Sequence, residues 1–405
     1  MRWSRVVTYS LLAAAVFAAC HEASEPTNSS ADLAAKAAQL EKQRGLDASL
    51  LAAAQKGDVA ATTALLGQGA NVNARNDTGA TPLILAAQLE QFDELKTLLD
   101  HGADPNAHDA PGATALLRAA GGGHVAAVQA LLDKGANPNF ASPKGWTALM
   151  EAAYNGQTEA VQLLLTRGAK PDAGNQAGTT AAYWASATGH IDTVKALMAK
   201  GASVTTPDML GITPLMVAAG NGHAPMVSFL LANGASVAAS DSDGRTALLT
   251  GAGSGNPEVL DILLAAGADA TVTQHDGTTA LMVAAEQGTL DSVQRLLAKG
   301  LDVKAADADG TTALALAADG GHANVVALLL DKGANVNAAD KSGTTALMRA
   351  ADDGDPETIK ILLQHGADLN ASNEDGDTAL KLAKDADNDE AVALLRDARE
   401  KPSGQ

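Results

Sequence analysis

The thirty residues from Asp309 to Ala338, DGTTALALAADGGHANVVALLLDKGANVNA, contain the pattern on which most of this chain is built. They read as a tight turn, a short alanine-rich helix, a glycine turn, a longer Leu/Val helix and a Gly-Ala-Asn ending. Thr312 stands where the N-cap of the first helix is expected, because its hydroxyl can accept a backbone N–H that the helix leaves free. Two sister units place a proline directly after this threonine, at the first helical position, where a missing N–H costs nothing.

The turn glycine of this unit, Gly310, belongs to a series that recurs every 33 residues from Gly79 to Gly376 without insertion or deletion. A second glycine series has the same spacing and runs from Gly69 to Gly366. Neither helix can bury its apolar stripe within one unit, so neighbouring units must stack. We therefore predict an all-α repeat solenoid of stacked 33-residue helix-turn-helix units with short hairpin connections.

The unit resembles the ankyrin repeat in its period, its Thr-Pro-Leu or Thr-Ala-Leu core, its Ala-Ala pair, its Gly-His in several units, its Leu-Leu pair and its Gly-Ala-Asn ending. The resemblance covers about residues 46 to 398. In this family, partners usually bind the concave side, which is formed by the hairpin tips and the exposed edge of the first helix. The resemblance thus implies protein binding without catalysis, with contact residues at the variable positions of that surface.

The chain divides by pattern into a repeat region and short flanking segments. The terminal units differ from the rest: Lys384 and Arg396 replace apolar residues of the unit and turn a polar face to water. The predicted organisation is a signal peptide (1–19), a tether with a possible lead-in helix (20–45), an N-terminal capping repeat (46–78), nine repeats (79–375), a C-terminal capping repeat (376–398) and a tail (399–405).

The first twenty residues have two arginines followed by an apolar run that ends in small residues, which is the layout of a bacterial secretory signal. Cys20 is the single cysteine of the chain, and Phe17-Ala18-Ala19-Cys20 resembles a lipoprotein cleavage box. We expect Cys20 to carry lipid and to anchor the protein on the periplasmic side of a cell envelope. The alternative is ordinary cleavage near Phe17, which would give a soluble periplasmic or secreted protein.

The formal net charge of −19 argues against binding of nucleic acid, which needs basic patches. We expect a monomer that binds a protein, touches a membrane only through its lipid, and has no cofactor, no metal site and no catalytic residues. The run Asp241-Ser-Asp243-Gly244 superficially matches a calcium loop, but the first acidic ligand and the closing Glu are missing. Aspartate beside glycine is typical of a turn.

Contact residues are sought at five positions per unit, counted from each turn glycine: the two residues before it, the one after it, and those nine and ten places later. Large apolar side chains gather at or near these positions in three successive units, and exposed aromatics often dominate binding energy. The predicted partner-binding residues are Phe140, Trp146, Tyr154, Tyr183, Met209, Leu210 and Ile212. For Tyr183 and Trp184 the alternative is that they fill space beside Ala182. Phe92 and Phe229 fall on second helices and are expected in the core.

Towards the C-terminus the same positions become acidic. The predicted acidic surface consists of Asp309, Asp319, Asp352, Asp353, Glu374 and Asp375. It is either an ordinary solvated face or a surface that steers a basic partner. The sequence thus favours a non-catalytic scaffold or adaptor of the bacterial envelope; the alternative is a dedicated inhibitor, immunity or protective accessory protein of one periplasmic enzyme.

Overall fold

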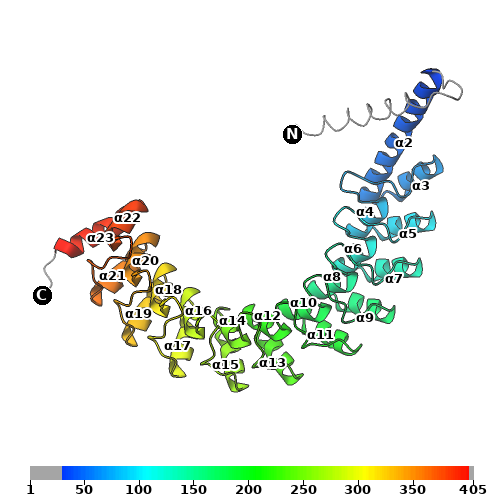
Figure 1. The fold of residues 1–405 in the computed structure, drawn as a ribbon. Coiled ribbons are helices and arrows are strands. Elements are labelled where there is room, and N and C mark those ends of the chain that lie inside the picture. Colours follow the sequence, from blue (N-terminus) through cyan, green and yellow to red (C-terminus); the bar gives the residue numbers. More distant parts are fainter. Residues whose placement is uncertain (1–29, 401–405) are drawn as a thin grey trace, which may run out of the picture.

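The computed structural model describes residues 30–400, within which the chain forms 22 helices and no strand. Short first helices alternate with mostly longer second helices, and the pairs stack on their neighbours in sequence order. Figure 1 shows an open arc with the two ends far apart, first helices on its inner side and second helices on its outer side. The predicted all-α repeat solenoid is confirmed.

The arc begins with the long helix α2 (Ser30–Lys56). The first helices of the following units are α4 (Pro82–Gln88), α6 (Ala115–Gly122), α8 (Ala148–Tyr154), α10 (Ala181–Ala187), α12 (Pro214–Gly220), α14 (Ala247–Ala252), α16 (Ala280–Glu286), α18 (Ala313–Asp319), α20 (Ala346–Asp353) and α22 (Ala379–Asp385). The second helices are α3 (Val59–Gly67), α5 (Phe92–Asp100), α7 (Val125–Asp133), α9 (Thr158–Thr166), α11 (Ile191–Met198), α13 (Ala224–Ala232), α15 (Pro257–Ala265), α17 (Leu290–Ala298), α19 (Ala323–Asp331), α21 (Pro356–Gln364) and α23 (Asp389–Glu400).

Threonine N-caps begin the first helices, as the sequence predicts. In α18 the N–H of Ala315 donates to the Thr312 hydroxyl at 3.3 Å, and Pro82 and Pro214 occupy the first turn of α4 and α12. The same bond forms at Thr81, Thr114, Thr147, Thr180, Thr213, Thr246, Thr279 and Thr345. Each cap stabilises its helix by about 1 kcal/mol and fixes where the hairpin ends.

One continuous core runs along the stack between the first and second helices. In the unit of α18 and α19, Leu314, Ala317 and Ala318 of the first helix are buried, and Val325 and Leu329 of the second helix are buried beside them. The alanines let first helices of neighbouring units approach closely, while the larger side chains of the second helices fill the wider outer layer. Each buried leucine or valine contributes about 1.5–3 kcal/mol.

Asparagines link the loops of successive units in a ladder. The side-chain oxygen of Asn73 accepts the N–H of Asp104 at 2.8 Å, and Asn337 accepts the N–H of Asp368 at 2.8 Å. Asn106, Asn139 and Asp172 accept equivalent N–H groups at 2.8–2.9 Å. The same register holds Thr205, Ala238, Thr271 and Lys304 in the four units between, all within the described residues, and these make no such bond. The ladder is therefore interrupted in the middle of the arc.

At the N-terminal end the possible lead-in helix is present, and it is continuous with the first helix of the capping repeat. Residues 30–56 form a single helix, α2, which includes the lead-in segment, Gly45 and the first helix of the capping repeat. Leu33 and Leu40 are exposed on its free half. Residues 1–29, with Cys20 and the expected signal peptide, lie outside the described residues, as do residues 401–405.

Candidate partner-binding surface

Trp184 is the centre of an aromatic cluster formed by two neighbouring first helices, α8 and α10, and the hairpin tip before α8. Its ring meets those of Trp146 at 5.0 Å, Tyr154 at 5.8 Å and Tyr183 at 5.5 Å between centroids, each edge to face. Such pairs add about 0.5–1.5 kcal/mol each beyond the area they bury. The rings therefore hold one another in place.

Both indole N–H groups of the cluster already have partners within the chain. The Trp146 N–H donates to the Glu151 carboxylate at 2.5 Å, and the Trp184 N–H donates to the Thr179 hydroxyl at 2.9 Å. Both tryptophans are half-buried against the core, and Tyr154 is 45% exposed. What the two tryptophans offer to a partner is therefore ring surface and not a hydrogen-bond donor.

Tyr183 does not belong to the exposed surface, so its assignment as a contact residue is wrong. It is only 8% exposed, and it lies at the third position of α10, where sister units bury Met150, Met216 and Met282. Burial, helped by the charge of Asp208, raises the pKa of its hydroxyl to about 12. The space-filling alternative therefore holds for Tyr183, whereas Trp184 is half-buried against the core and also supports the rings of Trp146 and Tyr154.

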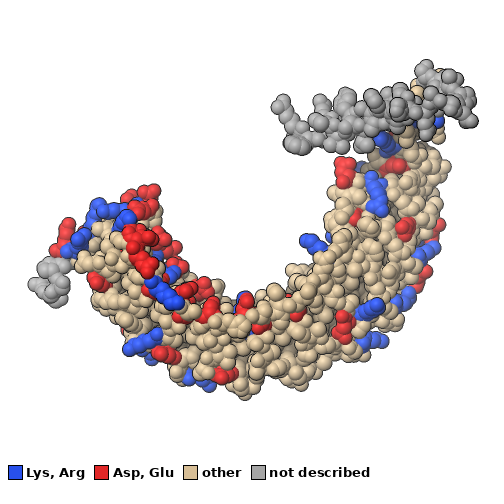
Figure 2. Space-filling view, in the orientation of Figure 1, with Lys and Arg blue, Asp and Glu red and all other residues tan. Residues whose placement is uncertain are grey.

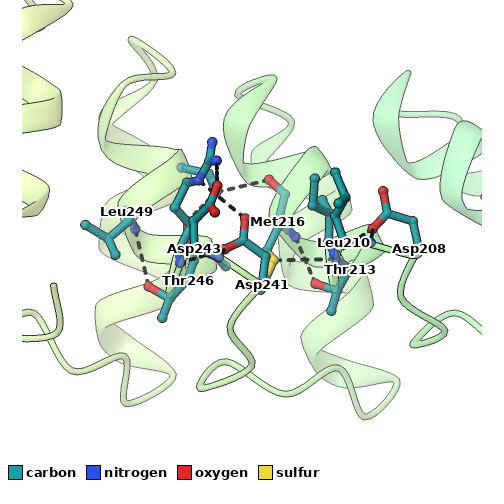
Figure 3. A network of polar contacts seen from close by, with 12 residues as sticks. Asp208, Leu210, Thr213, Met216, Asp241, Asp243, Thr246 and Leu249 are labelled. Carbon is teal, nitrogen blue, oxygen red and sulfur yellow. Dashed lines mark hydrogen bonds and ion pairs between the residues drawn. The ribbon is translucent and has the colours of Figure 1, made fainter. Parts of the chain in front are cut away.

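The hairpin tip before α12 continues the apolar surface into the next unit. Met209 is 75% exposed and Leu210 is 59% exposed, whereas Ile212 is partly buried against the core. The Asp208 carboxylate fixes this tip, because it accepts the N–H groups of Leu210 and Ile212, both at 2.9 Å (Figure 3). A Cβ added at Gly178 would lie 3.1 Å from Met209, so the methionine side chain lies over the preceding tip.

Phe140 lies apart from the cluster formed by Trp146, Tyr154 and Trp184. Its ring stacks on His108 at 5.6 Å, in the extended segments that precede two successive tips. We define the aromatic patch as Trp146, Tyr154, Trp184, Met209 and Leu210. It spans three consecutive units and retains four of the seven predicted contact residues.

The next tip shows why the Asp-x-Asp-Gly runs are turns. Asp241 accepts the N–H groups of Asp243 and Arg245 with one carboxylate oxygen, at 2.9 and 2.8 Å, and the other lies 3.4 Å from the Arg245 guanidinium (Figure 3). Both oxygens are thus engaged inside the hairpin. Among the described residues, no group of three or more His, Cys, Asp or Glu side chains is arranged to hold a metal ion.

The predicted acidic residues are all exposed. Figure 2 shows acidic side chains along the inner rim of the C-terminal units, whereas the inner surface of the middle units is largely uncharged. Arg349 lies among them and pairs with Asp319 at 3.6 Å and with Asp340 at 2.9 Å. One arginine offsets only part of the charge, so this surface remains acidic.

Family models described as ankyrin repeats (3 copies) match residues 50–142, 135–208, 205–274 and 252–340, and a model described as ankyrin repeats (many copies) matches residues 329–383. The chain belongs to the ankyrin-repeat family. Ankyrin repeats generally mediate protein–protein interaction, and ankyrin-repeat proteins are generally non-catalytic scaffolds. Among curated proteins, none matches the chain.

The ankyrin register also shows a residue that sequence reasoning misplaced. The expectation that Phe92 lies in the core is wrong, because it is the first residue of α5 and is 40% exposed there. Phe229, deeper in α13, does pack against the core. The signal for Phe92 was available, since it stands at the N-terminal end of its helix.

None of the helices within residues 30–400 combines the length and the apolar character needed to cross a bilayer. The predicted lipid attachment at Cys20 falls in the part of the chain that the structure leaves undescribed.

Proposed function

We propose that this ankyrin protein is a non-catalytic scaffold or adaptor of the bacterial cell envelope, and that its partner binds the aromatic patch on the concave face. The observation that supports this best is the exposed apolar surface shared by three adjacent units, on positions that need not be apolar for the fold. Met209 and Leu210 stand out from a tip that the Asp208 carboxylate already stabilises.

The chemistry of the patch indicates what the partner contributes. Both indole N–H groups are bonded internally, so the two tryptophans gain little from carbonyl groups of a partner and more from apolar or aromatic side chains. Centrally buried aromatic contacts in interfaces are each worth about 2 kcal/mol or more. The partner should therefore insert apolar anchors between Tyr154 and Met209.

The acidic surface around Asp352 and Glu374 gives the partner a second property. A basic segment would be attracted to it before contact, and the association rate would then fall as salt rises, because exposed charges are screened over about 8 Å at physiological ionic strength. We propose that this surface increases the association rate while the patch supplies affinity.

The envelope location rests on the sequence of the leader. The arginines, the apolar run and the single cysteine at the end of Phe17-Ala18-Ala19-Cys20 support lipid attachment. Incorporation of labelled fatty acid that disappears in Cys20→Ser would support the anchor. Unlabelled protein in the soluble periplasmic or secreted fraction would favour ordinary cleavage.

The patch is tested by affinity capture from an envelope extract. The variant Tyr154→Ala/Met209→Ser/Leu210→Ser removes the exposed part and leaves Trp146 in place, because truncating Trp146 would deprive the Glu151 carboxylate of its partner. We expect the bound partner to be lost while the melting temperature stays nearly unchanged. The control Leu40→Ser changes a residue that is 61% exposed, similar to the 59% of Leu210, but lies on α2. Equal capture by the triple variant and the control would overturn the proposal.

The alternative function is a dedicated inhibitor, immunity or protective accessory protein of one periplasmic enzyme. The same capture separates the two: a scaffold retains several proteins, whereas an inhibitor retains one enzyme in stoichiometric amount, and the activity of that enzyme changes on binding.

A further inference from the structure

A recess lies at the turns between first and second helices, at the opposite end of α4 from its hairpin tip. It has a volume of about 190 Å³ and lies between the turn before α5 and the turn before α7. Phe92, Leu95 and Val125 form its apolar wall, and Glu90 and His124 contribute polar groups. We call it the α5 pocket. It is separate from the aromatic patch, so binding at the pocket and binding at the patch can be tested independently.

Two departures from the repeat coincide in this pocket. Glu90 has a left-handed backbone with φ of 58°, at a position where glycine stands in nine sister units (Gly57, Gly123, Gly156, Gly189, Gly222, Gly255, Gly288, Gly321 and Gly354). Among the described units only Asp387 shares this feature. A side chain in this conformation is strained, and strain of this kind often marks a site where function needs the residue.

The second departure is Phe92, two residues later. Its register holds Val59, Val125, Thr158, Ile191, Ala224, Pro257, Leu290, Ala323, Pro356 and Asp389 in the other units. Phe92 is thus the single aromatic residue at this position within residues 30–400. The ring is 40% exposed beside the strained Glu90, so part of its face is accessible to a ligand.

The pocket has the size and the charge for one basic side chain. Its volume lies below the 300–1,000 Å³ or so that drug-sized ligands occupy, so it would accept a side chain more readily than a cofactor. The Glu90 carboxylate is largely exposed; one of its oxygens lies 3.4 Å from the His124 ring, and the side chain remains open to a further cation.

We propose that the α5 pocket receives an arginine side chain of a partner protein. The methylene stem would pack against Val125 and Ala126, and the guanidinium would stack on the Phe92 ring and pair with the Glu90 carboxylate. Arginine fits better than lysine, because its planar group both stacks on an aromatic face and forms two parallel hydrogen bonds to a carboxylate. The chain thus has a charged subsite at the edge of the arc in addition to its concave face.

The four phenylalanines of the chain allow a direct test, because selective ring labelling gives at most four sets of NMR signals, from Phe17, Phe92, Phe140 and Phe229. The probes are N-acetyl-arginine methylamide, the equivalent blocked lysine and blocked norleucine, each titrated into the full chain. We expect blocked arginine to shift the Phe92 signal, blocked lysine to shift it less and norleucine not at all, with Phe140 and Phe229 unmoved. The signal is assigned with Phe92→Leu.

Variants of Glu90 decide whether its carboxylate is the recognition group. Glu90→Gln keeps the shape and should abolish the arginine-dependent shift, as should Glu90→Gly, which restores the residue of the sister units. Asp387→Gly is the matched control: it relieves the same backbone strain in the last unit and should leave the Phe92 titration unchanged. The proposal is overturned if blocked arginine leaves Phe92 unmoved, if norleucine shifts it equally, or if Glu90→Gln responds like the wild type.

Discussion

Replacing Gly310 with alanine should destabilise the solenoid more than replacing Gly333 with alanine, although both glycines belong to the same unit. Their backbones are equally left-handed, with φ of 84° and 90°. Their surroundings differ. A Cβ at Gly333 would meet no atom within 4 Å, whereas a Cβ at Gly310 would lie 3.2 Å from the Asp340 Cα and 3.3 Å from the Lys341 nitrogen.

The size of the difference follows from these contacts. Both variants place an L-residue in the left-handed region, which costs roughly 1–2 kcal/mol. Gly310→Ala must in addition move the neighbouring hairpin, whose Lys341 N–H donates to the Asp309 carbonyl at 2.8 Å. Weakening that bond costs a further 0.5–1.5 kcal/mol or so. We therefore expect Gly310→Ala to lose about 1 kcal/mol more than Gly333→Ala.

Urea unfolding followed by far-UV circular dichroism measures the two losses, and amide hydrogen exchange locates them. Exchange at Lys341 should accelerate in Gly310→Ala and stay unchanged in Gly333→Ala, because only the first substitution separates adjacent tips. Equal losses of stability, together with unchanged exchange at Lys341, would refute the reasoning that tip glycines are needed for close approach between units.

Two further predictions concern polar groups in the stack. Glu94 is buried and accepts the Thr62 hydroxyl at 2.6 Å, and burial raises the pKa of its carboxyl above the ordinary value. The stability that the protonated Glu94 carboxyl contributes is therefore fully present below pH 4.5 or so, and it is lost as the pH rises through the elevated pKa. Glu94→Gln should unfold at a higher free energy than the wild type at neutral pH, by on the order of 1 kcal/mol, and its urea midpoint should vary less with acidic pH. Parallel profiles of urea midpoint against pH for the two proteins would contradict this. Ala238→Asn should extend the asparagine ladder, because the new side-chain oxygen can accept the N–H of Asp269 as Asn337 accepts that of Asp368. We expect the free energy of unfolding to rise by about 0.5–1.5 kcal/mol. An equal gain in Ala238→Leu, whose side chain has a similar size but cannot accept a hydrogen bond, would contradict this explanation.

Much of the scaffold could be predicted from the sequence because each unit repeats the same local rules. Thr312 caps its helix, and Leu314 and Ala317 are buried, because period, capping and apolar spacing all agree at these positions. At the N-terminal end the sequence indicates only a possible lead-in helix, whereas residues Ser30–Lys56 form one helix that runs through Gly45. A glycine inside a helix costs only about 1 kcal/mol, and extending a helix is easier than nucleating a second one.

The aromatic patch is predicted only in part, because the five positions per unit assigned to the concave face do not include the position of Trp184. Trp184 is the sixth residue after its turn glycine, a register that is half-buried in sister units such as those of Glu151 and Val217. Tyr183, the fifth, points into the core. Adjacent residues on a helix diverge by about 100°, so which ring supports the surface and which fills the interior depends on packing between units.

The interrupted asparagine ladder gives the arc an uneven bending stiffness. Thermal flexing should concentrate between Thr205 and Lys304, where loops of successive units lack the side-chain bond that ties the others, while the segments on either side deform little. The aromatic patch lies mostly on one stiff segment and the acidic surface mainly on the other. The protein would then consist of two stiffer segments joined by a more flexible one, so that the distance between the aromatic patch and the acidic surface can adjust to the size of a bound partner. Under a pulling force the flexible segment should extend first.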